Sequence, residues 1–541
     1  MTTEKRYNPW VVLVVLCTGF FMILLDTTVV QIAIPSIIDS LHASLDQILW
    51  VINAYILVYA VLLITAGRLG DVMGPRTLFV IGLVIFTAAS AYCGLAPDTM
   101  HLITARVIQG VGGALLTPQT LSMLTIIFPP ERRGAAFGIW GGISGIAAVI
   151  GPTLGGYLVT NFSWRAIFYI NVPVGIAAVV ATFLLVPDVR MDHQHTFDIG
   201  GVALASVGLF AIVFGLVDGQ RFNWGAVVGP ISIPLIIGLG VALLGAFVAW
   251  ESRQAEPLMP LSLFQNRNFS VMNWVGVTTS FGMLGLFLPI IIYFQSVLGM
   301  TALQAGLAVA PMSVVLMVVA PLSGRLSDAI GGKYILFLGC LIFGGGMGAI
   351  AFTSTTSATV WTFLPWFILA GVGLGMVFAP MATIAMRDIS ATMAGAASGI
   401  FNTTRQLGSL IGTAVVGAVL QNQLVTQLAA HAAAASTKLP PAYRQRFVQA
   451  FAQASQGGLQ VGPGQSGAAA LPAGIPPAIA KQLQVIVHSV FTNAYVDTLR
   501  PTLAIPISLM VLGAVSTLLV RRRPAATPTP EAPAPEPVFA G

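Results

Sequence analysis

Long apolar runs follow one another along this chain from Trp10 almost to Val520, and each is about as long as a bilayer crossing. A hydrocarbon core about 30 Å thick requires roughly 20 apolar residues in a helix, and lipid offers no partner to unpaired backbone groups. The runs lack the period-two alternation of a transmembrane β-barrel. With 56% hydrophobic and 8% charged residues, the chain is also too apolar for a water-soluble protein. The sequence therefore predicts an all-α polytopic membrane protein.

Turn and charge signals between these runs predict fourteen membrane-spanning helices. Basic residues test this number, because short cytoplasmic loops hold an excess of Lys and Arg. If the N-terminus is inside, the short outer loops hold only Arg165 and Arg221. An even number of spans with both termini cytoplasmic is therefore expected. The predicted spans cover residues 10–33, 47–66, 77–96, 101–127, 135–159, 165–186, 199–217, 226–250, 270–297, 303–322, 333–353, 360–385, 395–421 and 502–520.

Two passages recur at long range. "GRLGDVMGPRTL" from Gly67 resembles "GRLSDAIGGKYI" from Gly324, and "RGAAFGIW" from Arg133 resembles "AGAASGIF" from Ala394. The nearly equal separations indicate two six-helix bundles with two inserted helices between them. The predicted parts are a cytoplasmic tail (1–9), the first bundle (10–187), the inserted helix pair (188–260), the second bundle (261–422 and 501–520), an extracytoplasmic loop with amphipathic helices (423–500) and a disordered cytoplasmic tail (521–541).

Some functions are disfavoured by how the polar residues are distributed. The net charge is +6, but the basic residues are scattered singly and form no stripe for nucleic acid. The three cysteines lie inside apolar spans and are expected to pack rather than to pair. The sequence "GGKY" at Gly331 lacks the pattern of a phosphate-binding loop, so no nucleotide, cofactor or metal is expected. The outer loop is open to two interpretations, a lid or partner-binding surface and a tolerated insertion, and no periplasmic partner protein can be named.

Asp26 is the one acidic residue deep inside an apolar span, and an intramembrane carboxylate indicates function because its burial is costly. It precedes Pro35 by nine residues, which places it about 14 Å below the end of its helix at 1.5 Å per residue. Arg106 lies at a similar depth in the fourth span. If the two helices adjoin, the pair can form when the acid is ionised and separate when it is protonated. A purely structural ion pair is the alternative.

Arg405 is the other deep charge, in the thirteenth span. It either lines a central cavity or holds a backbone carbonyl in place. Because no acid lies in the ninth to fourteenth spans, the cavity lacks a second carboxylate for a dication. Monovalent cations and neutral amphiphiles are therefore the expected cargo. The candidate cavity residues are Thr28, Gln31, Gln109, Asn402, Arg405 and Gln406.

Several motifs occur in a fixed order, and the stretches that carry them are "LDTTVVQIAIP" from Leu25, "GRLGDVMGPR", "RVIQGVGGA" from Arg106, "GPTLGG" from Gly151, "WRAIFYINVPVG" from Trp164 and "NTTRQLG" from Asn402. Together they resemble the major facilitator superfamily and, within it, the fourteen-helix drug:proton antiporter branch. The likeness departs from the usual pattern at Gln31, where Asn is usual, and at Pro75, which replaces a basic residue.

This resemblance implies a major facilitator fold, alternating access between two bundles, and a secondary transporter of the bacterial inner membrane rather than an enzyme. It implies a protein embedded in the lipid bilayer that exports hydrophobic or monocationic drugs and toxins against a flow of protons, with Asp26 and Arg106 in proton coupling. A dedicated exporter of one metabolite is the alternative, and a membrane-embedded sensor or enzyme is a remote one. The implied gating motif is Gly67, Asp71, Gly74 and Arg76 with its repeat at Gly324 and Asp328, and the implied antiporter motif is Gly151, Pro152, Gly155 and Gly156.

Overall fold

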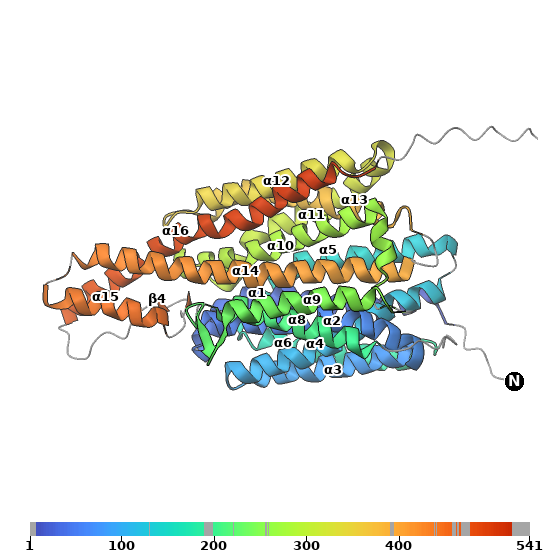
Figure 1. Cartoon of the computed structure of the whole chain (residues 1–541), viewed down its shortest axis with the longest axis horizontal. Helices are drawn as coiled ribbons and strands as arrows, with labels where there is room; N and C mark the ends of the chain where they lie inside the picture. Colours follow the sequence, from blue (N-terminus) through green and yellow to red (C-terminus); the bar gives the residue numbers. More distant parts are fainter. Residues whose placement is uncertain are drawn as a thin grey trace, which may run out of the picture.

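The computed structural model is almost entirely helical (Figure 1). It describes residues 7–128, 130–188, 198–219, 221–254, 257, 259–389, 394–437, 439, 441–456, 461–462, 465–466 and 477–521. The first half of the chain forms α1 (Pro9–Leu41), α2 (Leu45–Met73), α3 (Pro75–Leu95), α4 (Thr99–Ile127), α5 (Pro130–Asn161), α6 (Ala166–Tyr169) and α7 (Asn171–Leu185). Two further helices follow, α8 (Ile199–Asp218) and α9 (Ile233–Glu251), with the short strands β1 (Ala226–Val228) and β2 (Ile231–Ser232) between them.

The second half repeats this succession of long helices. It comprises η1 (Leu261–Gln265), α10 (Arg267–Ile292), η2 (Tyr293–Val297), α11 (Ala302–Ile330), α12 (Lys333–Thr353), α13 (Val360–Met386), α14 (Ala394–Ser436), α15 (Pro441–Gln456) and α16 (Pro477–Thr517). The strands β3 (Val461–Gly462) and β4 (Gln465–Ser466) form an antiparallel pair between α15 and α16.

The helices have the length and composition of membrane spans. Among the described residues, 12 helices are long and apolar enough to cross a bilayer. Helices α4 and α5 fall outside that set, but they have 29 and 32 residues and thus also exceed the length of a crossing. The predicted all-α polytopic fold is confirmed, and the number of fourteen spans stays a prediction.

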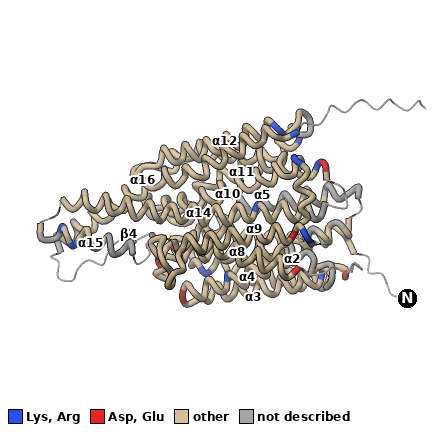
Figure 2. Tube along the Cα trace, in the orientation of Figure 1, with Lys and Arg blue, Asp and Glu red and all other residues tan. Residues whose placement is uncertain are grey.

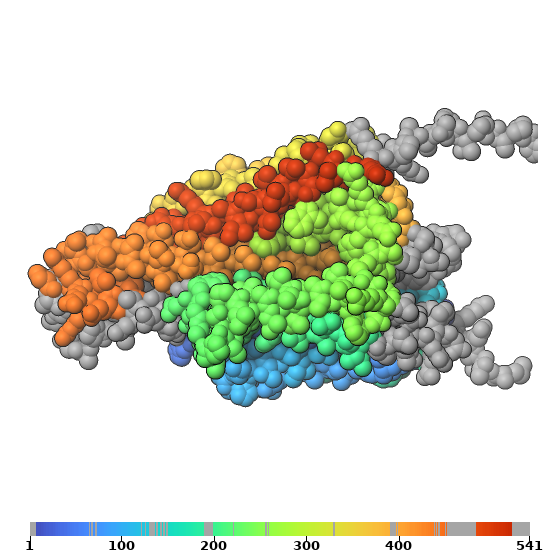
Figure 3. Space-filling view, viewed as in Figure 1, coloured from blue at the N-terminus to red at the C-terminus, as the bar shows by residue number. Residues whose placement is uncertain are grey.

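The two halves of the chain meet through two pairs of helices. Helix α5 of the first half packs on α11 of the second, and α2 packs on α14. The inserted helices α8 and α9 pair with each other, and α8 contacts both α2 and α14. In the space-filling view, α14 lies recessed between this pair and α16 (Figure 3). The inserted pair therefore borders the junction of the halves.

The repeat detected in the sequence has the same backbone in both copies. Gly74 ends α2 with φ 89° and ψ 133°, and Gly331 ends α11 with φ 89° and ψ 137°. A positive φ of this size favours glycine, because it has no Cβ. The two loops thus turn the chain in the same way between equivalent helices. The limits of the predicted bundles at 187, 260 and 422 stay predictions.

The predicted outer loop differs from the structure at its edges. Its limits of 423 and 500 fall inside α14 and α16, which continue as helices well past them. Helix α15 and the start of α16 coincide with the two predicted amphipathic helices. Contacts between the extended helices accompany the extension. Phe447 and Phe451 of α15 are buried, with ring centroids 5.0 Å apart. His431 of α14 pairs with Asp497 of α16 at 2.8 Å. Polar residues in these segments lie on the outside of a small helical cluster and do not end the helices.

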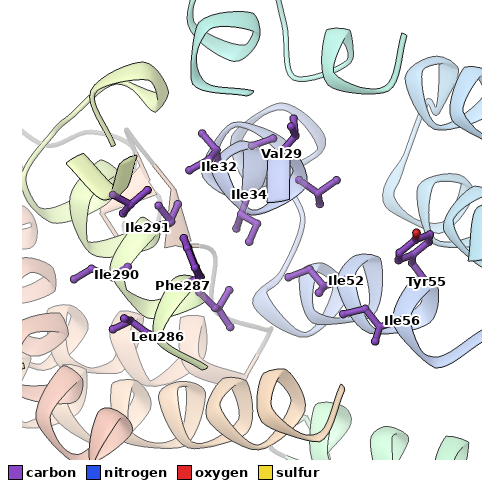
Figure 4. Packing of buried hydrophobic residues seen from close by; sticks show 14 of the residues in the cluster. Val29, Ile32, Ile34, Ile52, Tyr55, Ile56, Leu286, Phe287, Ile290 and Ile291 are labelled. Carbon is purple, nitrogen blue, oxygen red and sulfur yellow. The ribbon is translucent and has the colours of Figure 1, made fainter. Parts of the chain in front are cut away.

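The described charges gather at the two ends of the bundle, and few lie in the middle (Figure 2). The start of α1 and the end of α16 lie at the same end of the molecule (Figure 1). We call this end the termini end and the opposite one the far end. In the interior, Ile34 of α1, Ile52 of α2 and Phe287 of α10 belong to one buried apolar cluster that spans both halves (Figure 4). A continuous apolar core therefore surrounds the few buried charges.

Candidate functional site

Helices α1 and α4 bring Asp26 and Arg106 into direct contact. The Nη1 of Arg106 donates to Asp26 Oδ2, and the two residues are 1% and 2% exposed, respectively. The Nε of Arg106 also donates to the carbonyl of Val51 in α2, at 3.2 Å. The ion pair therefore ties three helices together. A buried pair of this kind is costly to break from one side only, because the remaining charge is left without compensation.

Gln109 completes the pair. One turn after Arg106 on α4, its Nε2 donates to Asp26 Oδ1 at 2.9 Å, and its Oε1 accepts from Arg106 Nη1 at 2.8 Å. The amide thus contacts both charges at once. Gln109 is fully buried, and the structure places this candidate cavity residue inside the ion-pair network. Its orientation is fixed by the opposite demands of a carboxylate and a guanidinium.

The network extends to two residues that the sequence analysis missed. Ser90 of α3 accepts from Gln109 Nε2 at 3.3 Å and from Asn171 Nδ2 of α7 at 3.0 Å, and donates to the carbonyl of Phe168 at 3.0 Å. Ser90 and Asn171 are both buried. Asn171 could have been found from the sequence, because it is an amide inside an apolar span. A serine in the same setting is unremarkable.

Two tyrosines of α2 connect the pair with the second half of the molecule. The guanidinium carbon of Arg106 lies 4.1 Å from the ring centroid of Tyr55, and the rings of Tyr55 and Tyr59 stack with centroids 6.0 Å apart. The hydroxyl groups of Tyr59 and Thr117 are 3.0 Å apart. Tyr59 also interacts with Gln406 of α14 and lies near Arg405. Aromatic rings therefore link Arg106 to α14.

Arg405 lies in the first third of α14, against α10 and α13. Its guanidinium carbon is 5.0 Å from the ring centroid of Phe378 in α13, and its aliphatic stem passes Gly276 of α10, where a Cβ would lie 3.0 Å from Arg405 Cγ. Arg405, Gln406 and Asn402 are all partly exposed. These three candidate cavity residues thus share one stretch of α14. Tyr59 and Phe378 were not predicted from the sequence, because lone aromatics are common in apolar spans.

The predicted antiporter motif in α5 allows two close helix contacts. A Cβ at Gly151 would lie 1.9 Å from Thr28 Oγ1, and one at Gly155 would lie 2.9 Å from Val29 Cγ1, both on α1. On another face, a Cβ at Gly156 would lie 2.6 Å from the Cα of Leu303 in α11. In the same contact, the carbonyl oxygen of Pro152 lies 2.2 Å from where a Cβ of Gly306 would be. The motif therefore joins α5 both to the helix that carries Asp26 and to the other half.

The remaining candidates are scattered. Arg76 donates to the carbonyl of Phe183 at 2.7 Å, and a Cβ at Gly324 would lie 3.4 Å from Ala379 Cβ. Gln31 is buried, and its Oε1 has no hydrogen-bond partner among the described residues. The surroundings of Gly67 and the side chains of Asp71 and Asp328 lie outside the described part of the structure. The gating motif is thus described at Gly74, Arg76 and Gly324 alone.

Comparison with known proteins defines the family. The model of the Major Facilitator Superfamily matches residues 16–413 of this chain. The chain belongs to the major facilitator superfamily. It is a polytopic membrane transporter, and its fold is the one that the motifs implied.

Several members of the superfamily resemble this chain over most of its length. An uncharacterised transporter of Mycobacterium tuberculosis is 40% identical over 422 residues, or 78% of this chain and 72% of the relative. The tetracenomycin C resistance and export protein of Streptomyces glaucescens is 35% identical, with 77% of each chain covered. The multidrug resistance protein Stp of Mycobacterium tuberculosis is 35% identical, with 76% of each covered.

Solved structures share the fold. A bacterial homologue of the human lysosomal transporter Spinster, in an inward-facing and occupied conformation, has a TM-score of 0.65 at 17% identity, covering 96% of this chain and 97% of that one. A bacterial homologue of the human peptide transporters PepT1 and PepT2 has a TM-score of 0.56 at 12% identity, covering 94% and 98%. At these identities, the likeness concerns the fold alone.

Proposed function

We propose that this chain exports hydrophobic small molecules, including drugs and toxins, across the bacterial cytoplasmic membrane in exchange for protons. The observation that carries this proposal is the buried pair of Asp26 and Arg106, whose carboxylate is bound by both a guanidinium and an amide. Relatives named for multidrug resistance and for antibiotic resistance and export support the cargo class. In this proposal both termini are cytoplasmic, so that the far end faces outward.

The proton acts through the ion pair. Protonation of Asp26 removes its charge, and Arg106 then keeps Gln109, the carbonyl of Val51 and the ring of Tyr55 as partners. Because Asp26 is on α1 and Arg106 on α4, loss of the pair loosens the contact between these helices. Helix α1 also touches the antiporter motif of α5, and α5 contacts the other half, so a shift of α1 reaches the junction of the halves. A protonated and an ionised Asp26 thereby favour different arrangements.

The energy of the proton gradient is sufficient for this cycle. One charge that moves down a membrane potential releases about 2.3 kcal/mol per 100 mV, and a pH gradient adds to it. In this account, the candidate cavity residues Asn402, Arg405 and Gln406 contact the cargo, and the two glycine-containing loops at Gly74 and Gly331 act as gates at the termini end. Asp71 and Asp328 are proposed as their acidic members.

A narrower version of this function is favoured by two relatives. One is the tetracenomycin C resistance and export protein, and another is the probable actinorhodin transporter of Streptomyces coelicolor, which is 35% identical with 78% of this chain covered. A dedicated exporter of one metabolite would have the same proton site. The two versions differ in the breadth of cargo.

Drug efflux in everted membrane vesicles tests the proposal. Vesicles that contain the chain should accumulate a fluorescent hydrophobic drug when respiration supplies a proton gradient, and a protonophore should stop the accumulation. Asp26→Asn should abolish it while the protein remains in the membrane. Accumulation that survives the protonophore would contradict proton coupling, and the number of drugs accumulated distinguishes the broad from the dedicated exporter.

A further inference from the structure

No anionic partner of the Arg405 guanidinium is found among the described residues. Within the part of the chain that the structure describes, Arg405 forms no ion pair, and its Nε is enclosed without a hydrogen-bond partner. The charges of Asp26 and Arg106, in contrast, cancel each other. The deep charges of the described residues therefore leave an excess positive charge in α14. An uncompensated charge at membrane depth is costly and is a mark of function.

Arg405 also differs from other arginines of this protein. Arg76, Arg165 and Arg387 each donate to a backbone carbonyl, at 2.7, 3.0 and 2.9 Å. No such bond from Arg405 is found among the described residues, so the alternative that it holds a carbonyl in place is not supported. Its neighbours are the ring of Phe378, Gly276, which lies against its aliphatic chain, and Tyr59. None of these balances its charge.

The surroundings of Arg405 suit an oxygen with a negative charge. A guanidinium presents a planar fork of donors that matches a carboxylate. Gln406 adds an amide donor and Tyr59 a hydroxyl from the other half of the molecule. The ring of Phe378 supplies an apolar face beside the charge. Arg405, Gln406 and Asn402 are partly exposed, so the site is open to a ligand.

We propose that Arg405, together with Tyr59 and Gln406, binds an anionic oxygen, a carboxylate or phenolate, on an aromatic cargo molecule. This inference rests on the proposed export function and specifies its substrate class. It differs from the expectation of monovalent cations or neutral amphiphiles, which rested on the lack of an acid in the ninth to fourteenth spans. Asp26 is neutralised by Arg106, and a cation near Arg405 would be repelled. The stacked rings of Tyr59 and Tyr55 join this binding site to Arg106.

Three amphiphiles with one ring system but different charges test the substrate class. The full-length protein in liposomes is assayed with pyrenebutyrate, its neutral methyl ester, and pyrenebutyl-trimethylammonium. Arg405→Gln should reduce transport of pyrenebutyrate at least tenfold, change transport of the ester less than twofold and not reduce transport of the ammonium compound. Arg405→Lys should retain part of the pyrenebutyrate transport. Arg500→Gln is the matched control, because Arg500 is an exposed arginine whose guanidinium carbon also lies over an aromatic ring, 5.6 Å from the centroid of Phe352.

Binding in detergent separates this inference from the proposed function. Pyrenebutyrate fluorescence should show saturable binding to the original protein, at least tenfold weaker binding to Arg405→Gln, and unchanged binding to Arg500→Gln. Equal losses for all three amphiphiles, or pyrenebutyrate binding that does not depend on Arg405, would overturn the inference. Selective binding without proton-driven transport would instead contradict the proposed function alone. If Arg405→Gln does not elute as a monodisperse protein, Arg405→Lys is measured instead; it keeps the charge but not the donor fork, so it should show a partial loss of pyrenebutyrate binding and no loss for the ester, and equal binding of all three amphiphiles to Arg405→Lys and the original protein would overturn the inference.

Discussion

Gln109 is the residue that distinguishes this proton site from a simple ion pair. Its amide contacts Asp26 at 2.9 Å and Arg106 at 2.8 Å, so the strength of both hydrogen bonds depends on the charges of these two residues. A protonated Asp26 no longer attracts the amide as a carboxylate does. Gln109 should therefore change its contacts in each transport cycle, with Ser90 as the partner that remains.

Gln109→Leu should slow proton-driven export about 10- to 100-fold, because loss of a hydrogen bond to a charged group costs about 1.5–3 kcal/mol. It should also change the pH dependence of export, which a purely structural role would not do. The measurement is the initial rate of export in vesicles between pH 6 and 8. Gln119→Leu is the control, since Gln119 is a buried amide on the same helix that donates to the carbonyl of Ala66 at 2.7 Å. Identical pH profiles for the two variants would refute this role.

Sequence predicted the charged residues of the site better than its neutral ones. Asp26 and Arg106 stand out because charges are rare at membrane depth, and counting residues from the helix ends places them at one level. Ser90 and Asn171 were not predicted, because a neutral polar residue in a span costs less and has many ordinary roles. The contacts of Gln109 with the ion pair were not predicted, because helical periodicity alone does not give the direction of a side chain, and its place in the cavity stays a prediction.

At the scale of elements, close helix contacts depend on glycines. Gly151 of α5 is one of them, because a Cβ there would lie 1.9 Å from Thr28 Oγ1 and 2.7 Å from Thr28 Cβ. The contact joins α5 to the helix that carries Asp26. The sequence motif predicted tight packing here, but only the structure shows that two different helices, α1 and α11, approach its two faces.

Gly151→Ala should destabilise the protein by about 1–3 kcal/mol, as overpacking of a close contact does. We expect less monodisperse protein after heating in detergent and slower export by the remainder. Gly345→Ala in α12 is the control, since a Cβ there would meet nothing within 4 Å. Equal thermal stability of the two variants would contradict this prediction, because it would mean that the contact between α1 and α5 accommodates a methyl group at no cost in stability.

The lengths of the helices were predicted less well than their existence. Apolar runs end where polar residues begin, and this rule placed the limits of the outer loop at 423 and 500. In the structure, α14 and α16 continue past these limits, and α15 packs on α14, with Phe447 and Phe451 buried. Such packing depends on residues far apart in sequence, and an amphipathic pattern alone does not indicate which helix it joins.

For the whole molecule, the described contacts identify one closed end. The tight contact of Gly156 with Leu303 and the hydrogen bond from the amide of Leu303 to Thr160 Oγ1, at 3.0 Å, lie at the far ends of α5 and α11. The far-end residue Gln295 of η2 also donates to the carbonyl of Ile32 at 2.9 Å. With the termini end in the cytoplasm, as proposed, these contacts belong to a state that is closed to the outside.

A disulfide across this contact should stop export. Thr160→Cys combined with Leu303→Cys places two thiols at the far end of α5 and α11, while the natural cysteines Cys17, Cys93 and Cys340 are buried. Oxidation should abolish export in the double variant, and a reductant should restore it. Each single variant, treated with the same oxidant, is the control. Full export by a completely cross-linked protein would mean that the two halves need not part at this end.

The repeat in the sequence predicted the two halves of the molecule but not how they meet. Equal loops at Gly74 and Gly331 were recognisable because the same strained turn requires the same glycine. The pairing of α5 with α11 and of α2 with α14 could not be recognised in the sequence, because helices in lipid share similar apolar surfaces.

Proton movement in liposomes is the decisive test of exchange between cargo and protons. Purified protein is reconstituted with a pH-sensitive dye in the lumen, and a pulse of cargo is added without any imposed pH gradient. Cargo transported by the original protein should drive protons the opposite way, and Asp26→Asn should move no protons under the same pulse. Cargo movement by the original protein without any counterflow of protons, or an undiminished proton signal in Asp26→Asn, would contradict it.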